Sequence, residues 1–231
     1  MEQSEFDKFA DEYRQLHDKN IRLSGESGDY FAKYKIEDLR DISSTLGFPE
    51  DISILDFGCG VGNTLPYLSE FFPMADIHGA DVSVKSLGIV QERFENKYTL
   101  HVIGNESENL DNAFDIIFVA CVFHHIDHDK HIEVLKTLKR MLKRNGLLVI
   151  FEHNPLNPLT VHAVNTCPFD ENAQLLKSSK LEHSLQETGY LDIHKSYRIF
   201  FPAFLKKLRK WEKRLTWCPL GAQYYIYAVN K

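Results

Sequence analysis

The sequence predicts an α/β protein with a doubly wound, mostly parallel sheet that is covered by helices on both faces. Two observations predict this fold. Short β-rich runs alternate with helical patterns along residues 52–151, and a glycine-rich segment joins the first run to the helical pattern that follows it. We therefore expect ligands to bind beyond the carboxyl ends of the parallel strands.

The expected elements begin with two helical patterns at residues 2–20 and 29–46, which a Ser-Gly-Glu-Ser-Gly break separates. The β-rich runs that follow lie at 52–56, 75–80, 99–103, 114–120 and 146–151, and the helical patterns between them lie at 63–72, 84–96 and 128–143. The fourth run is almost entirely apolar, as expected of a strand buried on both faces. We predict an N-terminal helical cap over residues 1–47 and one globular unit over residues 48–231.

After residue 151 the alternation weakens. Three prolines predict a long loop: Pro155, Pro158 and Pro168. A helix near 170–188, a strand near 190–200, a basic helix near 203–215 and a last strand at 222–229 should follow. No crossover helix of the usual kind separates the last two strands, so we expect them to pair as a hairpin at the sheet edge, with the basic helix inserted between them.

Composition and charge indicate one soluble, intracellular domain with appendages. The net charge of −6 argues against a protein that binds nucleic acid over its whole surface. The four cysteines form no C-x-x-C pair, which indicates reduced thiols rather than a disulfide framework: Cys59, Cys121, Cys167 and Cys218. The N-terminus is unlike a signal peptide, and no apolar run is long enough to cross a membrane. We expect a cytoplasmic monomer or homodimer.

The glycine-rich segment points to a nucleoside ligand. It follows Asp56 and alternates glycines at Gly58, Gly60 and Gly62, so that a ligand could lie against bare backbone at a helix N-terminus. Asp81 ends the second expected strand and could accept hydrogen bonds from both ribose hydroxyls. Its alternative role is to cap the next helix, and the two roles can coexist.

The nucleoside could belong to a dinucleotide or to S-adenosylmethionine. The dinucleotide fingerprint G-x-G-x-x-G requires a third glycine where this chain has Asn63. A carboxylate at Asp56 would also repel a pyrophosphate, whereas it would suit the α-ammonium group of a methionine moiety. We infer a cationic nucleoside without phosphate.

These segments together resemble those of the class I S-adenosylmethionine-dependent methyltransferases. Residues 56–62 match that family's D-x-G-x-G-x-G loop, and Asp81 matches its ribose-binding acid. Residues 114–117 with 123–126 match its fourth-strand segment, and 142–148 match its turn into strand five. The resemblance, which covers about residues 48–152, implies a Rossmann-like sheet of seven strands with an antiparallel last strand. It also implies S-adenosylmethionine as cofactor and S-adenosylhomocysteine as product.

The resemblance implies which residues hold the cofactor. Gly104-Asn105-Glu106 stands where the family commonly has Gly-Asp beside the adenine. The expected cofactor-binding residues are Asp56, Gly58, Cys59, Gly60, Gly62, Asn63, Asp81, Val82, Asn105, Glu106 and Ala120.

The family mechanism is in-line attack on the sulfonium methyl group, with a general base where the nucleophile is a hydroxyl. Candidate acceptor-side groups follow the fourth and fifth strands: His124, His125, Glu152, His153 and Asn154. We predict His125 first, His153 second and Glu152 as catalytic residues. The alternative is that these are structural or cofactor-side polar groups. His124, His128 and His131 share a helical spacing, but a helix start near residue 128 removes His124 from the register, so we expect no metal.

Residues 203–215 combine six basic side chains with an apolar stripe at helical spacing. Three interpretations remain open for this stretch: a lid over an anionic acceptor, a peripheral membrane-surface helix, or a plain amphipathic helix packed on the domain. Our hypothesis is a methyltransferase that acts on a small-molecule acceptor at oxygen, with carbon as the alternative. The rival functions are an NAD-dependent oxidoreductase, a non-catalytic S-adenosylmethionine-binding module and an RNA-directed methyltransferase, the last disfavoured by the acidic charge.

Overall fold

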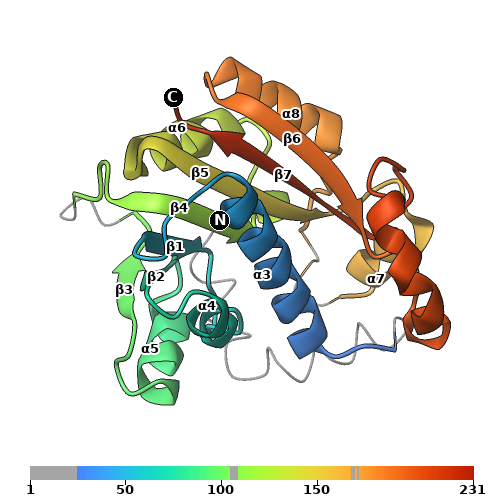
Figure 1. Cartoon of the computed structure of the whole chain (residues 1–231), viewed down its shortest axis with the longest axis horizontal. Helices are drawn as coiled ribbons and strands as arrows, with labels where there is room; N and C mark the ends of the chain where they lie inside the picture. Colours follow the sequence, from blue (N-terminus) through green and yellow to red (C-terminus); the bar gives the residue numbers. More distant parts are fainter. Residues whose placement is uncertain (1–24, 105–108, 168–169, 171) are drawn as a thin grey trace.

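The computed structural model describes residues 25–104, 109–167, 170 and 172–231, and its centre is a seven-stranded sheet in the order β3-β2-β1-β4-β5-β7-β6 (Figure 1). The strands are β1 (Ser53–Phe57), β2 (Asp76–Asp81), β3 (Thr99–Val102), β4 (Phe114–Ala120), β5 (Leu142–His153), β6 (Leu191–Arg198) and β7 (Gln223–Val229). The pairs among β1 to β5 are parallel, whereas β7 runs antiparallel to both of its neighbours, β5 and β6. The predicted fold class, with its antiparallel last strand, is confirmed.

Helices cover both faces of this sheet, as the sequence predicts. Helices α3 (Gly28–Thr45), α4 (Leu65–Phe71) and α5 (Val84–Arg93) contribute to the hydrophobic core on one face, and α6 (His131–Met141) and α8 (Ser178–Glu187) contribute to the core on the other. Within β4, Ile116 and Phe118 point to the first core, and Ile117 and Val119 point to the second. This alternation makes β4 apolar throughout, because a central parallel strand is buried on both faces.

The segment between β5 and β6 differs from the prediction. Residues expected to form a loop include α7 (Pro158–Asn165), and the next helix, α8, begins only at Ser178. Helix α7 begins where it does because the side chain of Asn157 accepts hydrogen bonds from the backbone N–H groups of Leu159 and Thr160, at 3.0 and 3.1 Å. Pro158 follows this cap at the first helical turn, where proline is favoured, and it was therefore wrong to read it as a loop residue.

The bounds of the remaining elements agree with the prediction to different degrees. Strand β5 begins at Leu142, four residues before the predicted start, whereas α3 matches the second expected helix closely. The helix expected at residues 2–20 lies outside the described residues. The division into a cap over 1–47 and a globular unit over 48–231 stays a prediction. Within the described part of the chain, no helix is both long enough and apolar enough to span a bilayer.

The basic segment lies between β6 and β7, as predicted, but as a kinked 3₁₀ helix, η4 (Ala203–Arg214), rather than an α-helix. Its predicted apolar stripe does not enter a core, since Phe204 is 81% exposed and Trp211 is 44% exposed. Buried Glu212 anchors the segment instead, accepting hydrogen bonds from the backbone N–H groups of Phe200 and Phe201 at 3.0 Å. Arg209 adds an ion pair of 2.7 Å with Glu26, and its guanidinium lies over the ring of Tyr30.

Candidate active site

The loop after β1 forms the cradle that the glycine pattern predicts. Gly58 and Gly60 adopt left-handed backbone conformations, with φ of 79° and 52°. A Cβ atom at Gly58 would lie 2.4 Å from Val122 Cγ2, so the close approach of the segment after β4 requires glycine there. A Cβ atom at Gly60 would meet nothing within 4 Å, so the loop presents bare backbone to open space at this residue. A ligand can therefore approach the main chain closely.

Asp81 ties this cradle to the second strand. One carboxylate oxygen accepts a hydrogen bond from the backbone N–H of Gly60 at 2.8 Å, and the other accepts from the backbone N–H of Ser83 at 2.9 Å. Ser83, rather than Asp81, caps helix α5. Asp81 is thus held rigidly beside the open face of Gly60, as a group that binds ribose hydroxyls requires.

Asp56 lies deeper in the cradle and is fully buried. Its side chain accepts a hydrogen bond from the Thr64 hydroxyl. Burial, together with the nearby charge of Asp81, raises the pKa of Asp56 to about 7 despite that hydrogen bond. A positively charged ligand group beside this carboxylate would restore its ionised form. Two buried acids beside bare backbone fit a cationic nucleoside better than a pyrophosphate.

The other predicted cofactor residues have more varied positions. The thiol of Cys59 lies toward Gly60 and Gly79, where it packs within the loop. Asn63 accepts a hydrogen bond from Arg93 at 3.1 Å, and Ala120 ends β4 beside the cradle. Asn105 and Glu106 lie outside the described residues. Gly62, like the other loop glycines, adopts a left-handed conformation, with φ of 76°, and Val82 directly follows β2.

Glu152 is placed to hold the backbone after β4. It lies near the end of β5, is completely buried, and accepts hydrogen bonds from the backbone N–H groups of Val122 and Phe123 at 3.0 and 2.7 Å. Its second oxygen accepts from Nδ1 of His124 at 2.7 Å. Burial opposes its charge, but the His124 interaction outweighs burial and lowers the pKa of Glu152. All of these contacts turn it inward, which suits a positioning residue rather than one that touches an acceptor.

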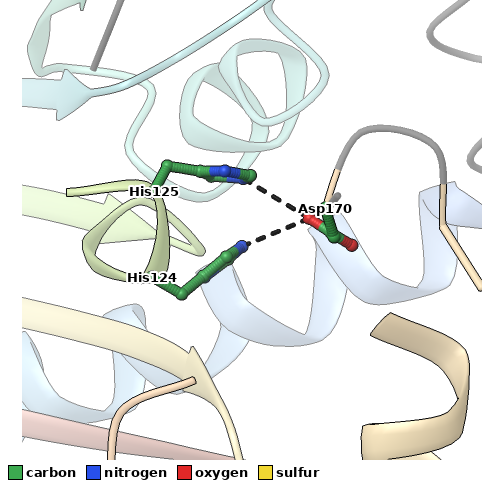
Figure 2. Close-up of side chains that lie close together, drawn as sticks. All are labelled: His124, His125 and Asp170. Carbon is green, nitrogen blue, oxygen red and sulfur yellow. Dashed lines mark ion pairs between the residues drawn. The ribbon is translucent and has the colours of Figure 1, made fainter. Parts of the chain in front are cut away.

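The side chains of His124 and His125, which follow β4, both lie toward Asp170 (Figure 2). Nε2 of each ring lies 3.5 Å from the same oxygen of Asp170. Burial disfavours the charge on His124, but Glu152 and Asp170 outweigh it and raise the His124 pKa to about 10. Burial and the neighbouring His124 lower the pKa of His125 to about 3. The histidines at helical spacing, which the sequence analysis considered and set aside as metal ligands, are not grouped as one set, because His131 donates to the backbone oxygens of Phe123 and Ile126 at 3.0 Å.

A second polar cluster lies where β4 and β5 end, and of its members the sequence analysis had singled out only His153 as a site residue. It consists of Tyr34, Lys35, Cys121, His153 and Gln223. Lys35 Nζ lies 3.4 Å from the sulfur of Cys121, and Gln223 Nε2 lies 3.4 Å from Nδ1 of His153 while its oxygen accepts from the Tyr34 hydroxyl. Burial would raise the pKa of the Cys121 thiol, but Lys35 and His153 lower it to about 6.

The position of Cys121 directly after the apolar strand was the available signal for this cluster. Lys35 carried no such signal, because a lysine in a helical pattern is usually exposed. Lys35 also acts electrostatically on Asp56, so the cluster adjoins the cofactor cradle.

Comparison with known proteins agrees with this geometry. Residues 55–148 match the model of a family described as "Methyltransferase domain". The chain is 32% identical over 155 residues to "Demethylmenaquinone methyltransferase" of Thermotoga maritima, covering 66% of this chain and 61% of that protein. It is 30% identical over 111 residues to "Malonyl-[acyl-carrier protein] O-methyltransferase" of Bacillus cereus, covering 47% of this chain and 40% of that protein. The chain thus spans only part of the length of these curated relatives.

Solved structures agree on the fold. A structure described as an S-adenosylmethionine-dependent methyltransferase, possible histamine N-methyltransferase, from Thermotoga maritima superposes with a TM-score of 0.65 at 17% identity, covering 99% of both chains. An S-adenosylmethionine-dependent methyltransferase from Aquifex aeolicus superposes with a TM-score of 0.59 at 18% identity, covering 100% of both chains. Together these matches support a class I S-adenosylmethionine-dependent methyltransferase, the family that the sequence motifs resemble, and S-adenosylmethionine is the cofactor of that family.

Proposed function

We propose that this protein binds S-adenosylmethionine in the loop between β1 and α4 and transfers its methyl group to a small-molecule acceptor, releasing S-adenosylhomocysteine. The observation that carries the proposal is the cradle itself. Asp56 and Asp81 flank bare backbone at Gly60, and the two polar clusters lie beyond it at the carboxyl ends of β4 and β5. When bound, the cofactor supplies an electrophilic methyl group, and the chain orients an acceptor toward it and excludes water.

The acceptor atom that we propose is oxygen, with carbon as the alternative. His153 lies in the cluster that adjoins the cradle, where an imidazole nitrogen can take a proton from an acceptor hydroxyl. His125, which the sequence favoured first, faces the carboxylate of Asp170 instead. We therefore propose His153 as the base. One similar protein is named as an O-methyltransferase, which is consistent with attack by oxygen.

The acceptor that suits this cluster carries a negative charge or develops one during the reaction. Lys35 is a buried cation beside Cys121, and an anionic oxygen near it would gain a charge-assisted hydrogen bond. The names of similar proteins cover acceptors as different as demethylmenaquinone and malonyl-[acyl-carrier protein], so they support the reaction class and not one substrate.

The first experiment is calorimetry on ligand-stripped protein with S-adenosylhomocysteine and, in parallel, NADH. Saturable binding of the first and none of the second supports the proposal, whereas the reverse result would support an oxidoreductase. The second experiment incubates the protein with labelled methyl donor and a metabolite extract. Binding without label transfer to any metabolite would favour the non-catalytic binding module.

A further inference from the structure

The geometry points to a binding site for a divalent transition-metal ion, formed by Nε2 of His124, Nε2 of His125 and the carboxylate of Asp170 (Figure 2). This inference goes beyond the proposed methyl transfer and revises the expectation, drawn from helical spacing alone, that the chain holds no metal. The three side chains come from the short 3₁₀ turn η2 (Phe123–His125) and from a residue more than forty positions later in the chain.

The ligand atoms are spaced as an ion requires. Each histidine Nε2 lies 3.5 Å from the same Asp170 oxygen, and the three atoms all lie within 4.8 Å of one another. Tetrahedral bonds of about 2.0–2.2 Å set ligand atoms about 3.3–3.6 Å apart. The two distances to Asp170 already match this spacing, and the two imidazole nitrogens, held within 4.8 Å of each other, would close by about 1.5 Å at most to share one ion.

A buried carboxylate orients the first ligand. Nδ1 of His124 donates a hydrogen bond of 2.7 Å to Glu152, so an ion that displaces the proton facing Asp170 leaves the tautomer with its proton on Nδ1 and the lone pair of Nε2 as the ligand. Glu152 is itself fixed by two backbone N–H groups. Metal-binding histidines almost always donate their other ring N–H group to such a partner, and this partner sets ring orientation.

The set of ligands selects the type of ion. Two imidazoles and one carboxylate suit Zn²⁺, Co²⁺ or Fe²⁺, whereas Mg²⁺ and Ca²⁺ prefer oxygen ligands. The side chains of His125 and Asp170 are 14% and 13% exposed, while His124 is buried, so the cluster reaches the surface on one side. Three protein ligands leave a tetrahedral ion one further position for water or for an oxygen of a bound molecule.

The place of the cluster relates it to the proposed reaction. The ring centroid of His124 lies 5.2 Å from that of His153, the proposed base. An oxygen bound at the open position would be near the carboxyl edge of β4 and β5, and coordination to a divalent ion lowers the pKa of a bound hydroxyl or water.

The test is a titration of the full, chelator-treated chain with Zn²⁺ by calorimetry and with Co²⁺ by visible absorption. We expect about one equivalent of each to bind, with Co²⁺ bands typical of low coordination number, and no heat with Mg²⁺ at the same concentration. Asp170→Asn and His125→Ala should each weaken Zn²⁺ binding at least tenfold. Glu152→Gln should weaken it about 10- to 100-fold while leaving the stoichiometry unchanged.

The matched control is His183→Ala, since His183 is an exposed histidine on α8, outside both clusters, and it should bind Zn²⁺ like the unaltered chain. Each variant is first checked for binding of S-adenosylhomocysteine, which a correctly folded cradle retains. The inference would be overturned if the unaltered chain showed no saturable Zn²⁺ or Co²⁺ binding. It would also be overturned if Asp170→Asn and His125→Ala bound Zn²⁺ as tightly as the unaltered chain, which would leave a simple hydrogen-bonded bridge. If the unaltered chain did not bind S-adenosylhomocysteine, that result would instead refute the proposed function. The two failures are therefore distinguishable.

Discussion

At the scale of single residues, two acids perform different tasks in the cradle. Asp81 is tied to the backbone of Gly60 and Ser83, whereas Asp56 lies buried and accepts a hydrogen bond from the Thr64 hydroxyl. Asp81 can accept hydrogen bonds from a ligand at the open face of Gly60, and Asp56 can form an ion pair with a positively charged ligand group. Each assignment leads to a separate measurement.

Replacing Asp81 should weaken cofactor binding. Asp81→Ala removes the proposed ribose acceptor together with the tie to Gly60, and we expect the Kd for S-adenosylhomocysteine to rise tenfold or more, equivalent to about 1.4 kcal/mol or more. Calorimetry measures this Kd directly. Asp81→Asn keeps the shape of the side chain and one acceptor oxygen, so its Kd should lie between those of the unaltered chain and Asp81→Ala. An unchanged Kd in Asp81→Ala would contradict the ribose role.

Cofactor affinity should depend on the ionisation of Asp56. Its pKa is raised to about 7 by burial, so the carboxyl is mostly protonated at pH 6 and mostly ionised at pH 8. The cofactor ammonium favours the ionised form, so affinity should increase with pH, by up to about tenfold between these values. Calorimetry with S-adenosylhomocysteine in matched buffers measures the slope. Asp56→Asn should bind more weakly and lose that slope; a slope that persists would assign the titration to another group.

Removing the proposed base should affect turnover and not cofactor binding. His153→Ala is expected to lower kcat by about 10²- to 10⁴-fold, the usual contribution of a positioned general base. The Kd for S-adenosylhomocysteine should stay within about twofold, since the cradle contacts are unchanged. Rates are measured with an acceptor found by the labelling experiment. A His153→Ala enzyme with unchanged kcat would exclude this residue as the base.

At the scale of elements, caps and buried polar anchors decide where the segments after β5 begin. Asn157 caps α7 and also donates to the backbone oxygen of Leu220 at 2.7 Å, which joins this helix to the segment before β7. Glu212 performs a similar task for η4 through two backbone N–H groups. The first contact joins segments 63 positions apart in the chain, and the second holds η4 against the residues that follow β6.

The cap of α7 can be tested by stability. Asn157→Ala should lower the free energy of unfolding by about 0.5–2 kcal/mol, because two backbone N–H groups lose their acceptor. Asn157→Asp keeps the acceptor oxygens and serves as the control, with a smaller loss from the bond to Leu220. Urea denaturation gives both values. Equal stability of the alanine variant and the unaltered chain would show that the cap contributes nothing measurable.

At the scale of the whole molecule, the η4 segment of an acidic protein exposes both basic and apolar side chains. Phe204 is 81% exposed, and Trp217, close to the C-terminal end of η4, is 75% exposed. The basic residues of the same segment are Lys206, Lys207, Arg209, Lys210, Lys213 and Arg214. Of the three roles considered for residues 203–215, simple packing by the apolar stripe does not agree with these exposures. Peripheral contact with a membrane stays a prediction, as do the lid and the oligomeric state.

Sedimentation with lipid vesicles tests the membrane contact. We expect the full chain to bind vesicles that contain anionic lipid, to bind neutral vesicles weakly, and to dissociate as salt screens the charges. Phe204→Ser should reduce binding because it removes an exposed apolar side chain. Lys231→Ser, at the far end of the chain, serves as a charge control. Failure to bind anionic vesicles at low salt would leave the lid as the remaining role.

The sequence by itself determined the sheet and the glycine cradle and indicated the family, because each depends on local signals. Apolar runs mark strands, and glycine marks positions where other residues are strained or collide, as at Gly58. Only the tertiary structure decided which side chains from distant segments meet. It joined Lys35 to Cys121, turned Glu152 inward and brought Asp170 to His124 and His125. Such long-range contacts depend on how helices and loops fold back over the sheet edge. The local sequence around each residue carries no information about which distant residues it will contact.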